Sequence, residues 1–415
     1  MRPTDLGSCI GIRQIVIELG ETKRVHQIIA IEIDWRFPRF RPEIPRLRPG
    51  VSAKMSLVVQ GCRVPAGPIA PGGFLLCRLI ATLLTLGAVA VHELISGKRA
   101  LFRHLYVWLV LLASAAPAIV GAQELNGFDL KGSLIPRDQI YSGGPAKDGI
   151  PAIDKPHFVA AQSAPFLRAD DAVLGLVHKN IARAYPIRIL NWHEVVNDRY
   201  GDDAVVVTFC PLCGTGVAFD SRVDGWALSF GVSGLLYNSD VLMYDRQTQS
   251  LWSQLLAQAI SGPLKGRRLT MLPLTHTSWA DWRKSHPATQ VLSTNTGQPR
   301  PYARDAYPGY ESNAEMFFPV AFRAAGFHPK ERVLGVRIGN RTKAYPFVEL
   351  GKTAGTLSDQ IGDTALTIRF DRASARATAH GADGQQLAAV VSFWFAWYAF
   401  NPDTAVFRAE ERRLP

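Results

Sequence analysis

Cysteine is scarce in this chain, with five residues among 415. That count excludes a small scaffold held together by many disulfides. Charged residues make up only 20% of the sequence and apolar residues make up 47%. The chain is therefore not mainly disordered, and its length allows two or three domains.

Several familiar motifs are missing as well. The chain has neither a Walker-type phosphate-binding loop nor a Gly-x-Gly-x-x-Gly fingerprint. Gly231–Gly234 is one residue short of a nucleophile elbow, and the segment after His193 lacks the second histidine of a zinc-protease helix. The motifs name no reaction, so the sequence leaves open whether the protein is an enzyme.

The net charge of +11 is concentrated near the N-terminus. Residues 1–122 contain 15 Lys or Arg and 7 Asp or Glu, which leaves 31 and 28 for all the remaining residues. A body that is nearly neutral lacks the basic surface that nucleic-acid binding requires. We therefore expect no nucleic-acid partner.

Two apolar runs lie in this first part of the chain. Residues 79–91 form a run too short to span a bilayer. A second run, within residues 98–122, follows a basic flank and ends in small residues, which is typical of a secretory signal peptide. This segment, or an uncleaved membrane anchor in its place, predicts a periplasmic or otherwise extracytoplasmic protein with no other membrane contact. Residues 1–97 are then expected to be an extension without a domain, arising from a start site placed too far upstream.

An internal similarity is the most informative pattern. Identities recur at an offset of 160, which falls to 115 near the ends of the two segments. The matched pairs include Gly175 with Gly335, Tyr185 with Tyr345, Trp279 with Trp394, and Trp282 with Trp397. We therefore predict a duplicated unit, with copy 1 at 166–300, a linker at 301–330 and copy 2 at 331–408, after a lead-in at 123–165.

Both copies predict the same order of local structure. Strand-like runs flank an Asn turn, and a helix-like stretch at 190–197 or 350–360 precedes a strand at 204–209 or 365–370. A Trp-x-x-Trp helix stopped by proline ends each copy, its tryptophans serving as core anchors or as a ligand platform. This order predicts an α+β fold, mainly antiparallel β with short helices, internally duplicated with pseudo-twofold symmetry.

Residues present in copy 1 alone are the candidates for function, because shared residues serve the common fold. Cys210 and Cys213 can chelate one metal ion or form a small disulfide ring. Their Cys-Pro-x-Cys-Gly pattern is like one knuckle of a zinc ribbon, and the chain has no second knuckle. Another ligand must therefore complete the shell of any metal ion.

His193 is the first candidate for that ligand, followed by His276 and His286. The candidate catalytic set is Cys210, Cys213, His193 and Glu194, with His193 as third ligand or proton acceptor. Copper or zinc is the expected cofactor. A redox-active dithiol, a structural disulfide and buried thiols without any cofactor stay open as alternatives.

A second candidate set lies in the additional residues of copy 1. Tyr244, Asp245, Arg246 and Trp252 suit either a polar ligand or a hairpin turn with a surface ion pair. The first functional hypothesis is a metal-binding or thiol-redox protein that acts through the cysteine pair. The second is a binding module, or a hydrolase of unknown class, with a polar ligand in the cleft between the copies. Neither identifies the small-molecule or redox partner.

Four segments resemble one family. Thr208–Thr215, Gly234–Asp240, Tyr244–Arg246 and Ser250–Trp252 are similar to the signature of the bacterial and archaeal family catalogued as domain of unknown function 3179. The resemblance covers roughly residues 165–408. It implies an exported or membrane-anchored protein, and it implies no particular reaction.

Overall fold

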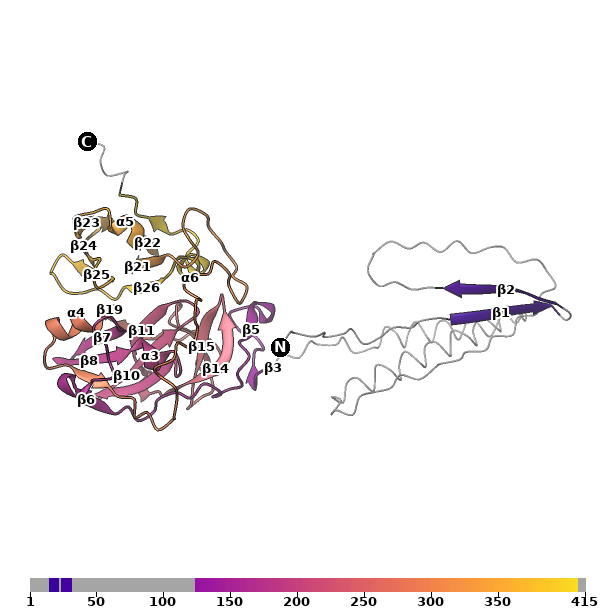
Figure 1. The fold of residues 1–415 in the computed structure, drawn as a ribbon, viewed down its shortest axis with the longest axis horizontal. Helices are drawn as coiled ribbons and strands as arrows, with labels where there is room; N and C mark the ends of the chain where they lie inside the picture. Colours follow the sequence, from indigo (N-terminus) through magenta and orange to yellow (C-terminus); the bar gives the residue numbers. More distant parts are fainter. Residues whose placement is uncertain (1–14, 22–23, 32–123, 410–415) are drawn as a thin grey trace. The chain divides into compact units, whose positions relative to one another are not determined.

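The computed structural model describes residues 15–21, 24–31 and 124–409 (Figure 1). The chain divides into two units, residues 1–119 and 120–415. In the first unit, strands β1 (Ile15–Glu21) and β2 (Arg24–Ile31) pair as an antiparallel hairpin. The predicted signal peptide or anchor at 98–122 lies outside the described residues. Within the described ranges, no helix is long and apolar enough to cross a bilayer.

Five β-sheets make up most of the second unit. Sheet 1 has the order β19 (Leu274–Ser278), β7 (Ala172–His178), β8 (Ile181–Pro186), β20 (Gln290–Leu292), β6 (Phe158–Ala160). Sheet 2 has the order β18 (Thr270–Leu272), β11 (Thr215–Asp220), β10 (Asp203–Cys210), β9 (Val195–Tyr200). Sheet 3 has the order β17 (Gln258–Ser261), β16 (Leu251–Ser253), β15 (Asp240–Asp245), β14 (Phe230–Tyr237), β5 (Ile140–Ser142).

The remaining two sheets come from the C-terminal part of the chain. Sheet 4 has the order β26 (Val390–Phe393), β21 (Arg332–Ile338), β22 (Arg341–Pro346), β27 (Ala405–Val406). Sheet 5 has the order β23 (Thr356–Ile361), β24 (Thr364–Asp371), β25 (Arg376–Gly381). Two small ribbons pair β3 (Glu124–Leu125) with β4 (Phe128–Asp129) and β12 (Arg222–Val223) with β13 (Trp226–Ala227).

Helices are few and short. The α-helices are α3 (Ile187–Leu190), α4 (Trp279–Ser285), α5 (Phe347–Leu350) and α6 (Trp394–Phe400), and the 3-10 helices are η1 (Arg137–Gln139) and η2 (Ala161–Ser163). Ser278 is the N-cap of helix α4, and its hydroxyl accepts a hydrogen bond from the backbone of Asp281. Both Trp-x-x-Trp helices end before a proline, as predicted.

Apolar side chains fill the spaces between facing sheets. One cluster joins sheets 1 and 2 through residues such as Leu174 and Val207, and another joins sheets 4 and 5 through Leu334 and Ile368. The largest cluster contains residues of sheets 2, 3 and 4 together, with Phe393 among them. The five sheets are arranged as in a five-bladed β-propeller.

The predicted fold class, an α+β protein with a pseudo-twofold duplication, is wrong. The described residues are mostly β, with 42% in strands and 10% in helices. The expected helix-like stretches at 190–197 and 350–360 overlap α3 and α5 only at Leu190 and Leu350, and the chain then turns directly into β9 and β23. Sheet 3 joins β14–β17 to the distant strand β5 and has no equivalent in residues 331–408, so one symmetry axis does not relate two halves.

Shared local packing explains the sequence identities that suggested the duplication. A Cβ atom on Gly175 would lie 2.2 Å from the ring of Trp282, and one on Gly335 would lie 2.2 Å from the ring of Trp397. Each tryptophan is buried against the strand that passes beneath it. The predicted strands at 204–209 and 365–370 are confirmed as parts of β10 and β24.

Candidate functional site

The cysteine pair lies in the tight loop between β10 and β11. Cys210 is the last residue of β10 and pairs with Thr215, so the chain reverses through the four residues between them. The backbone of Cys213 donates a hydrogen bond to the carbonyl of Cys210 over 3.2 Å. Gly214 has a φ of +59°, and a Cβ there would lie 2.8 Å from the ring of Phe393. Only glycine satisfies both the left-handed backbone and the close contact.

A second turn, between β14 and β15, brings a carboxylate to the thiols. Asn238 and Ser239 both have positive φ and form a two-residue hairpin turn closed by the Tyr237–Asp240 pair. The Ser239 carbonyl lies 3.2 Å from Sγ of Cys213 and 3.7 Å from Sγ of Cys210. The two sulfur atoms and one carboxylate oxygen of Asp240 lie within 4.8 Å of one another.

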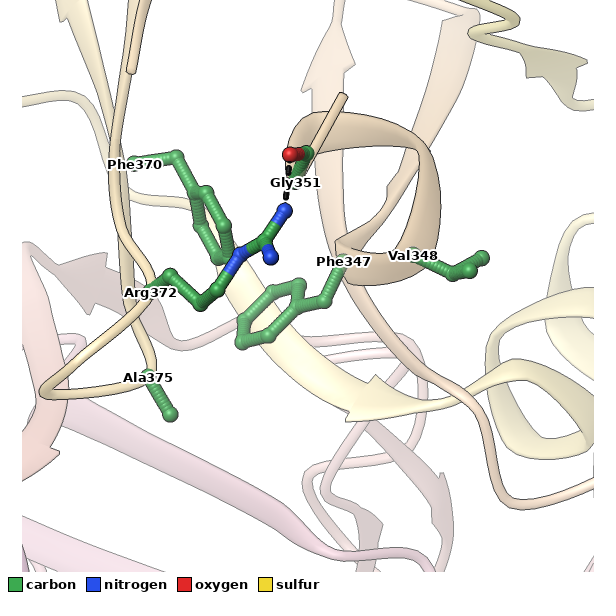
Figure 2. Close-up of a pocket in the computed structure, with 6 residues that line it drawn as sticks. All are labelled: Phe347, Val348, Gly351, Phe370, Arg372 and Ala375. Carbon is green, nitrogen blue, oxygen red and sulfur yellow. Dashed lines mark hydrogen bonds between the residues drawn. The ribbon is translucent and has the colours of Figure 1, made fainter. Parts of the chain in front are cut away.

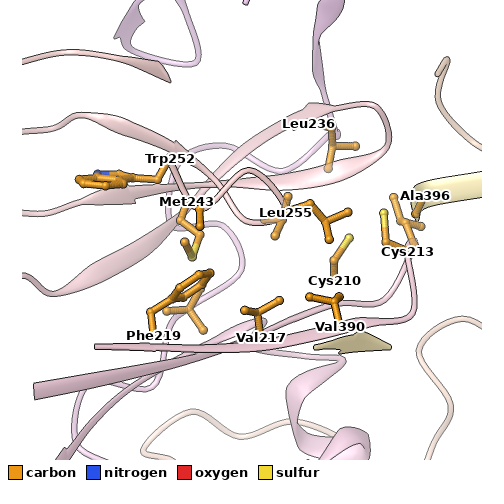
Figure 3. Packing of buried hydrophobic residues seen from close by; sticks show 14 of the residues in the cluster. Cys210, Cys213, Val217, Phe219, Leu236, Met243, Trp252, Leu255, Val390 and Ala396 are labelled. Atoms are coloured by element: carbon orange, nitrogen blue, oxygen red, sulfur yellow. The ribbon is translucent and has the colours of Figure 1, made fainter. Parts of the chain in front are cut away.

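These three residues are deeply buried. Cys210 and Cys213 are free thiols with 1% and 0% of their surfaces exposed, and Asp240 has 0% exposed. Figure 3 shows both cysteines among apolar side chains from sheets 2, 3 and 4, including Leu255 and Val390. Such surroundings provide little solvation for a charged group.

Burial changes the acidity of every titratable group in this region. It raises the pKa of both thiols, and Asp240 raises them further. Burial raises the pKa of Asp240 to about 7, although backbone N–H groups of Leu255 and Val241 act in the opposite direction. It raises the pKa of Glu194 to about 8, with a second contribution from the negative charge of Asp240.

The cluster of Cys210, Cys213, Asp240 and Glu194, here called the acidic cluster, has no cationic partner. Within residues 124–409, no lysine, arginine or histidine forms an ion pair with any of the four groups. Oδ1 of Asp240 is buried and makes no hydrogen bond. An isolated buried carboxylate oxygen is costly unless a proton or a cation satisfies it. The acidic cluster therefore favours protons or a bound cation.

The segment at 306–327 covers the acidic cluster. The Ser239 hydroxyl donates to the carbonyl of Phe318 over 2.9 Å, and the backbone of Ala321 donates to the Asn238 side chain over 2.8 Å. The Tyr310 hydroxyl donates to the carbonyl of Leu212, between the two cysteines, over 3.1 Å. Segment 306–327, here called the covering segment, is thus hydrogen-bonded to both the β10–β11 loop and the β14–β15 turn.

The structure places His193 in a different environment. Its Nδ1 lies 2.7 Å from the carbonyl of Pro151, which can only accept, so Nδ1 carries the hydrogen. Its Nε2 then accepts from the Tyr302 hydroxyl over 2.6 Å. Burial lowers the pKa of His193, which keeps the ring neutral. Both ring nitrogens have partners, and the residues that lie within metal-binding distance of each other do not include His193.

The other two candidate ligands, His276 and His286, are also absent from the group of residues within metal-binding distance of one another. His276, on β19, is buried edge-on against Phe209, and neither of its ring nitrogens has a hydrogen-bond partner. Burial lowers the pKa of His276 to about 3, so the ring is neutral. His286 lies against the ring of Trp282 with the ring centroids 4.1 Å apart.

The second predicted set forms a structural hairpin. Asp245 is buried and accepts hydrogen bonds from the backbone and hydroxyl of Thr248 and from the indole of Trp252. The Arg246 guanidinium forms ion pairs with Asp148 and Asp154, and it donates to the Tyr244 hydroxyl. The structure therefore brings Tyr244, Asp245, Arg246 and Trp252 together, but their polar groups bind one another or neighbouring residues of the protein.

A cavity beside α5 also offers few groups that could take part in a reaction. It has a volume of about 350 Å³ and lies between α5 and the end of β24 (Figure 2). Phe347 and Phe370 line it with their rings 5.2 Å apart, and the Arg372 guanidinium donates to the carbonyl of Gly351. Its lining contains no carboxylate, thiol or imidazole.

Asp240 is the candidate site residue that the sequence reasoning missed. It lies in a different sheet from the cysteines, and no local pattern indicates that the two turns meet. One signal was available, because Asp240 ends the family-like segment Gly234–Asp240. A carboxylate directly after a two-residue turn is held at a fixed place on the end of a hairpin.

Comparisons with known proteins bear on the same region. The model of a family described as "Protein of unknown function (DUF3179)" matches residues 147–390. No curated protein and no solved structure matches the chain. The matched residues include all four members of the acidic cluster.

Proposed function

Since the chain belongs to the DUF3179 family of proteins of unknown function, its chemistry must be inferred from its own geometry, and we propose that it binds a divalent metal ion through Cys210, Cys213 and Asp240. One observation carries this proposal. Two sulfur atoms and a carboxylate oxygen lie buried within 4.8 Å of one another, and no cationic side chain among the described residues forms an ion pair with them.

The donor set favours zinc over copper. Zinc accepts both thiolate and carboxylate ligands, whereas Cu(I) is selected by sulfur ligands alone. Asp240 supplies the carboxylate, and its unpartnered Oδ1 is available for a bond. The negative charge of Asp240 raises the pKa of Glu194, which lies outside the three residues within metal-binding distance of one another, so Glu194 is our candidate for a proton acceptor.

Metal binding would lower the pKa values of the cluster, which burial raises in the metal-free protein. Thiols and carboxylic acids must lose their protons to become ligands, and a divalent cation then balances their charge. The Ser239 carbonyl accepts hydrogen bonds from both thiols, and these bonds are lost when the thiols deprotonate, so the metal ion would replace them. Bound zinc supplies structural cross-linking, or Lewis acidity where one position stays open.

The thiol-redox alternative has weaker support. A redox-active cysteine needs a lowered pKa and access to its partner. Burial instead raises the pKa of both thiols, and segment 306–327 covers them. If the predicted signal peptide is used, the protein is exported to an oxidising compartment, where a bound metal ion would protect the pair from oxidation.

Metal analysis of the full chain tests the proposal. After reconstitution with zinc and dialysis, we expect about one zinc ion per chain and two thiols unreactive to a disulfide reagent. Cys213→Ser and Asp240→Asn should each reduce zinc affinity by at least about tenfold. Matched controls are Cys77→Ser, outside the described residues, and Asp202→Asn, an exposed carboxylate before β10.

Two results would contradict the proposal. One is a zinc content far below one per chain in reconstituted wild-type protein. The other is unchanged zinc affinity in both Cys213→Ser and Asp240→Asn, which would locate the metal elsewhere. A stable disulfide between the cysteines, with reversible reduction at a moderate potential, would favour the redox alternative instead.

A further inference from the structure

A second, polar cavity lies between sheets 1 and 5. Its volume is about 120 Å³, and it is lined by α4 and β19 on one side and by β24, β25 and the following turn on the other. Figure 1 shows β25 next to β19 and α4 in the ribbon, and these strands are in contact. The acidic cluster contributes no residue to this cavity.

The cavity has more positive than negative charge. Its lining contains two arginines, Arg369 and Arg376, and one carboxylate, Asp281. Nε of Arg376 lies 3.0 Å from Asp281, whose same oxygen also accepts from the Thr277 hydroxyl over 2.8 Å. The charge of Asp281 is therefore already balanced by Arg376. The terminal nitrogens of Arg376 have no hydrogen-bond partner within residues 124–409.

Arg369 is the unbalanced cation. In the described part of the second unit its side chain forms neither an ion pair nor a hydrogen bond, although eleven other lysines and arginines there form ion pairs. Guanidinium groups present paired N–H donors in one plane, a geometry that matches the oxygen atoms of an oxyanion. Two such groups facing one small hollow select for negative charge.

Neutral polar groups complete the wall. Nδ1 of His380 donates to the carbonyl of Gly384 over 3.1 Å, so its Nε2 accepts from the hydroxyl of Thr378 over 3.0 Å. The ring of His286 lies on the opposite wall, against Trp282, and its nitrogens have no hydrogen-bond partner among the described residues. Both ring nitrogens of His380 are thus engaged, which leaves the ring of His286 as the imidazole that can donate a hydrogen bond to a ligand oxygen.

We propose that this cavity binds a small oxyanion of the phosphate class, held between Arg369 and Arg376. The volume suits one tetrahedral group and excludes a polymer. The unpaired Arg369 supplies the positive charge, and the terminal nitrogens of Arg376 supply further donors. The site is independent of the proposed metal centre, because different sheets form it. Its failure and the failure of the metal proposal are therefore separable.

Calorimetric titration of the full chain with inorganic phosphate tests this site. Ionic strength is held constant with chloride, and sulfate and acetate are titrated in parallel. We expect phosphate to bind with a Kd of about 1 mM or tighter. Arg369→Gln should weaken binding by at least about tenfold, and it breaks no ion pair, so the fold is kept. Lys284→Gln removes an exposed charge from α4 outside the cavity and is the matched control.

Three outcomes would overturn the proposal. The first is an absence of phosphate binding by folded wild-type protein at millimolar concentration. The second is equal binding by wild-type protein and by Arg369→Gln. The third is binding of acetate without binding of phosphate or sulfate, which would assign the cavity to a carboxylate ligand. Sulfate binding alongside phosphate supports the tetrahedral class.

Discussion

Two carboxyl groups with raised pKa values give the acidic cluster a specific dependence on pH. Asp240, with a pKa of about 7, and Glu194, with a pKa of about 8, hold protons in the folded state that they release when unfolded at neutral pH. Their contribution to stability is present below about pH 4 and is lost as the pH rises through 7 to 8. The metal-free protein is therefore expected to be less stable at neutral pH than at acidic pH because of these two carboxyl groups.

The double variant Glu194→Gln/Asp240→Asn tests this dependence. Amides imitate the protonated acids without titrating, so the variant should fold. In urea unfolding with chelator present, we expect wild-type protein to lose stability relative to the variant by about 2 kcal/mol or more between pH 5 and pH 8. Comparing the two proteins cancels the titration of other groups, such as His276. A difference independent of pH would show that neither carboxyl group has a raised pKa.

At the scale of single residues, the sequence indicated the cysteines but not their real neighbours. Cys210 and Cys213 stand out because two sulfur atoms at this spacing must lie close together. Asp240 could not be found this way, since its approach depends on two hairpins from different sheets. His193 attracted attention through its position in the chain, yet its ring is held by Pro151 and Tyr302.

At the scale of elements, the contact between a tryptophan and a strand glycine makes a sharp prediction. Gly175→Ala would place a methyl group 2.2 Å from the ring of Trp282. We expect a loss of about 1–3 kcal/mol in the free energy of unfolding, because overpacking in a dense core forces side chains or backbone to move. Gly335→Ala, against Trp397, should behave in the same way.

A double variant identifies the cause of that loss. Gly175→Ala/Trp282→Leu removes the crowding ring, so the glycine substitution should cost less in that background than in the wild type. Urea unfolding of all four proteins of the cycle measures the coupling. Strict additivity of the two substitutions would show that the glycine serves the backbone rather than the ring.

The covering segment depends on one buried lysine. Nζ of Lys330 donates to the carbonyls of Tyr310, Asn313 and Glu315 over 2.6–2.7 Å, and it lies 3.4 Å from the centre of the Tyr310 ring. Tyr310 in turn reaches Leu212 between the cysteines. The lysine therefore links the order of this segment to the burial of the thiols.

Lys330→Met should expose the cysteine pair. The substitution removes three hydrogen bonds, so the segment is expected to open more often, and a disulfide reagent should modify the thiols at least about tenfold faster in metal-free protein. A background with Cys9, Cys62 and Cys77 changed to serine isolates the pair. Lys284→Met, at an exposed site, is the matched control. Equal rates in both variants would show that the lysine does not control access.

Element prediction succeeded where the pattern is local. The Asn180 turn, strands β10 and β24 and the two tryptophan helices follow from residue types and short spacings. The pairing of strands did not follow, because strand β5 joins β14 across almost one hundred residues and no local signal encodes that partner. The fold class was wrong for this reason.

At the scale of the whole molecule, the five sheets share their cores. The backbone of Phe393, on β26, donates to the carbonyl of Cys213, and the Phe393 ring packs on Gly214. Ala396 and Trp397, on α6, belong to the same apolar cluster as both cysteines. The C-terminal strands therefore complete the interior of the site instead of forming a separate unit beside it.

Truncation after residue 330 distinguishes this arrangement from two independent copies. The shortened chain lacks sheets 4 and 5, so one face of the cysteine loop loses its apolar cover. We expect no cooperative urea transition, rapid modification of both thiols and no zinc binding, since small domains fold only when their core is complete. Truncation after residue 409, which keeps every described strand, should retain all three properties. A cooperative transition with protected thiols in the shorter chain would instead mean that residues 124–330 fold alone. The cysteine loop would then not need the apolar cover of sheets 4 and 5.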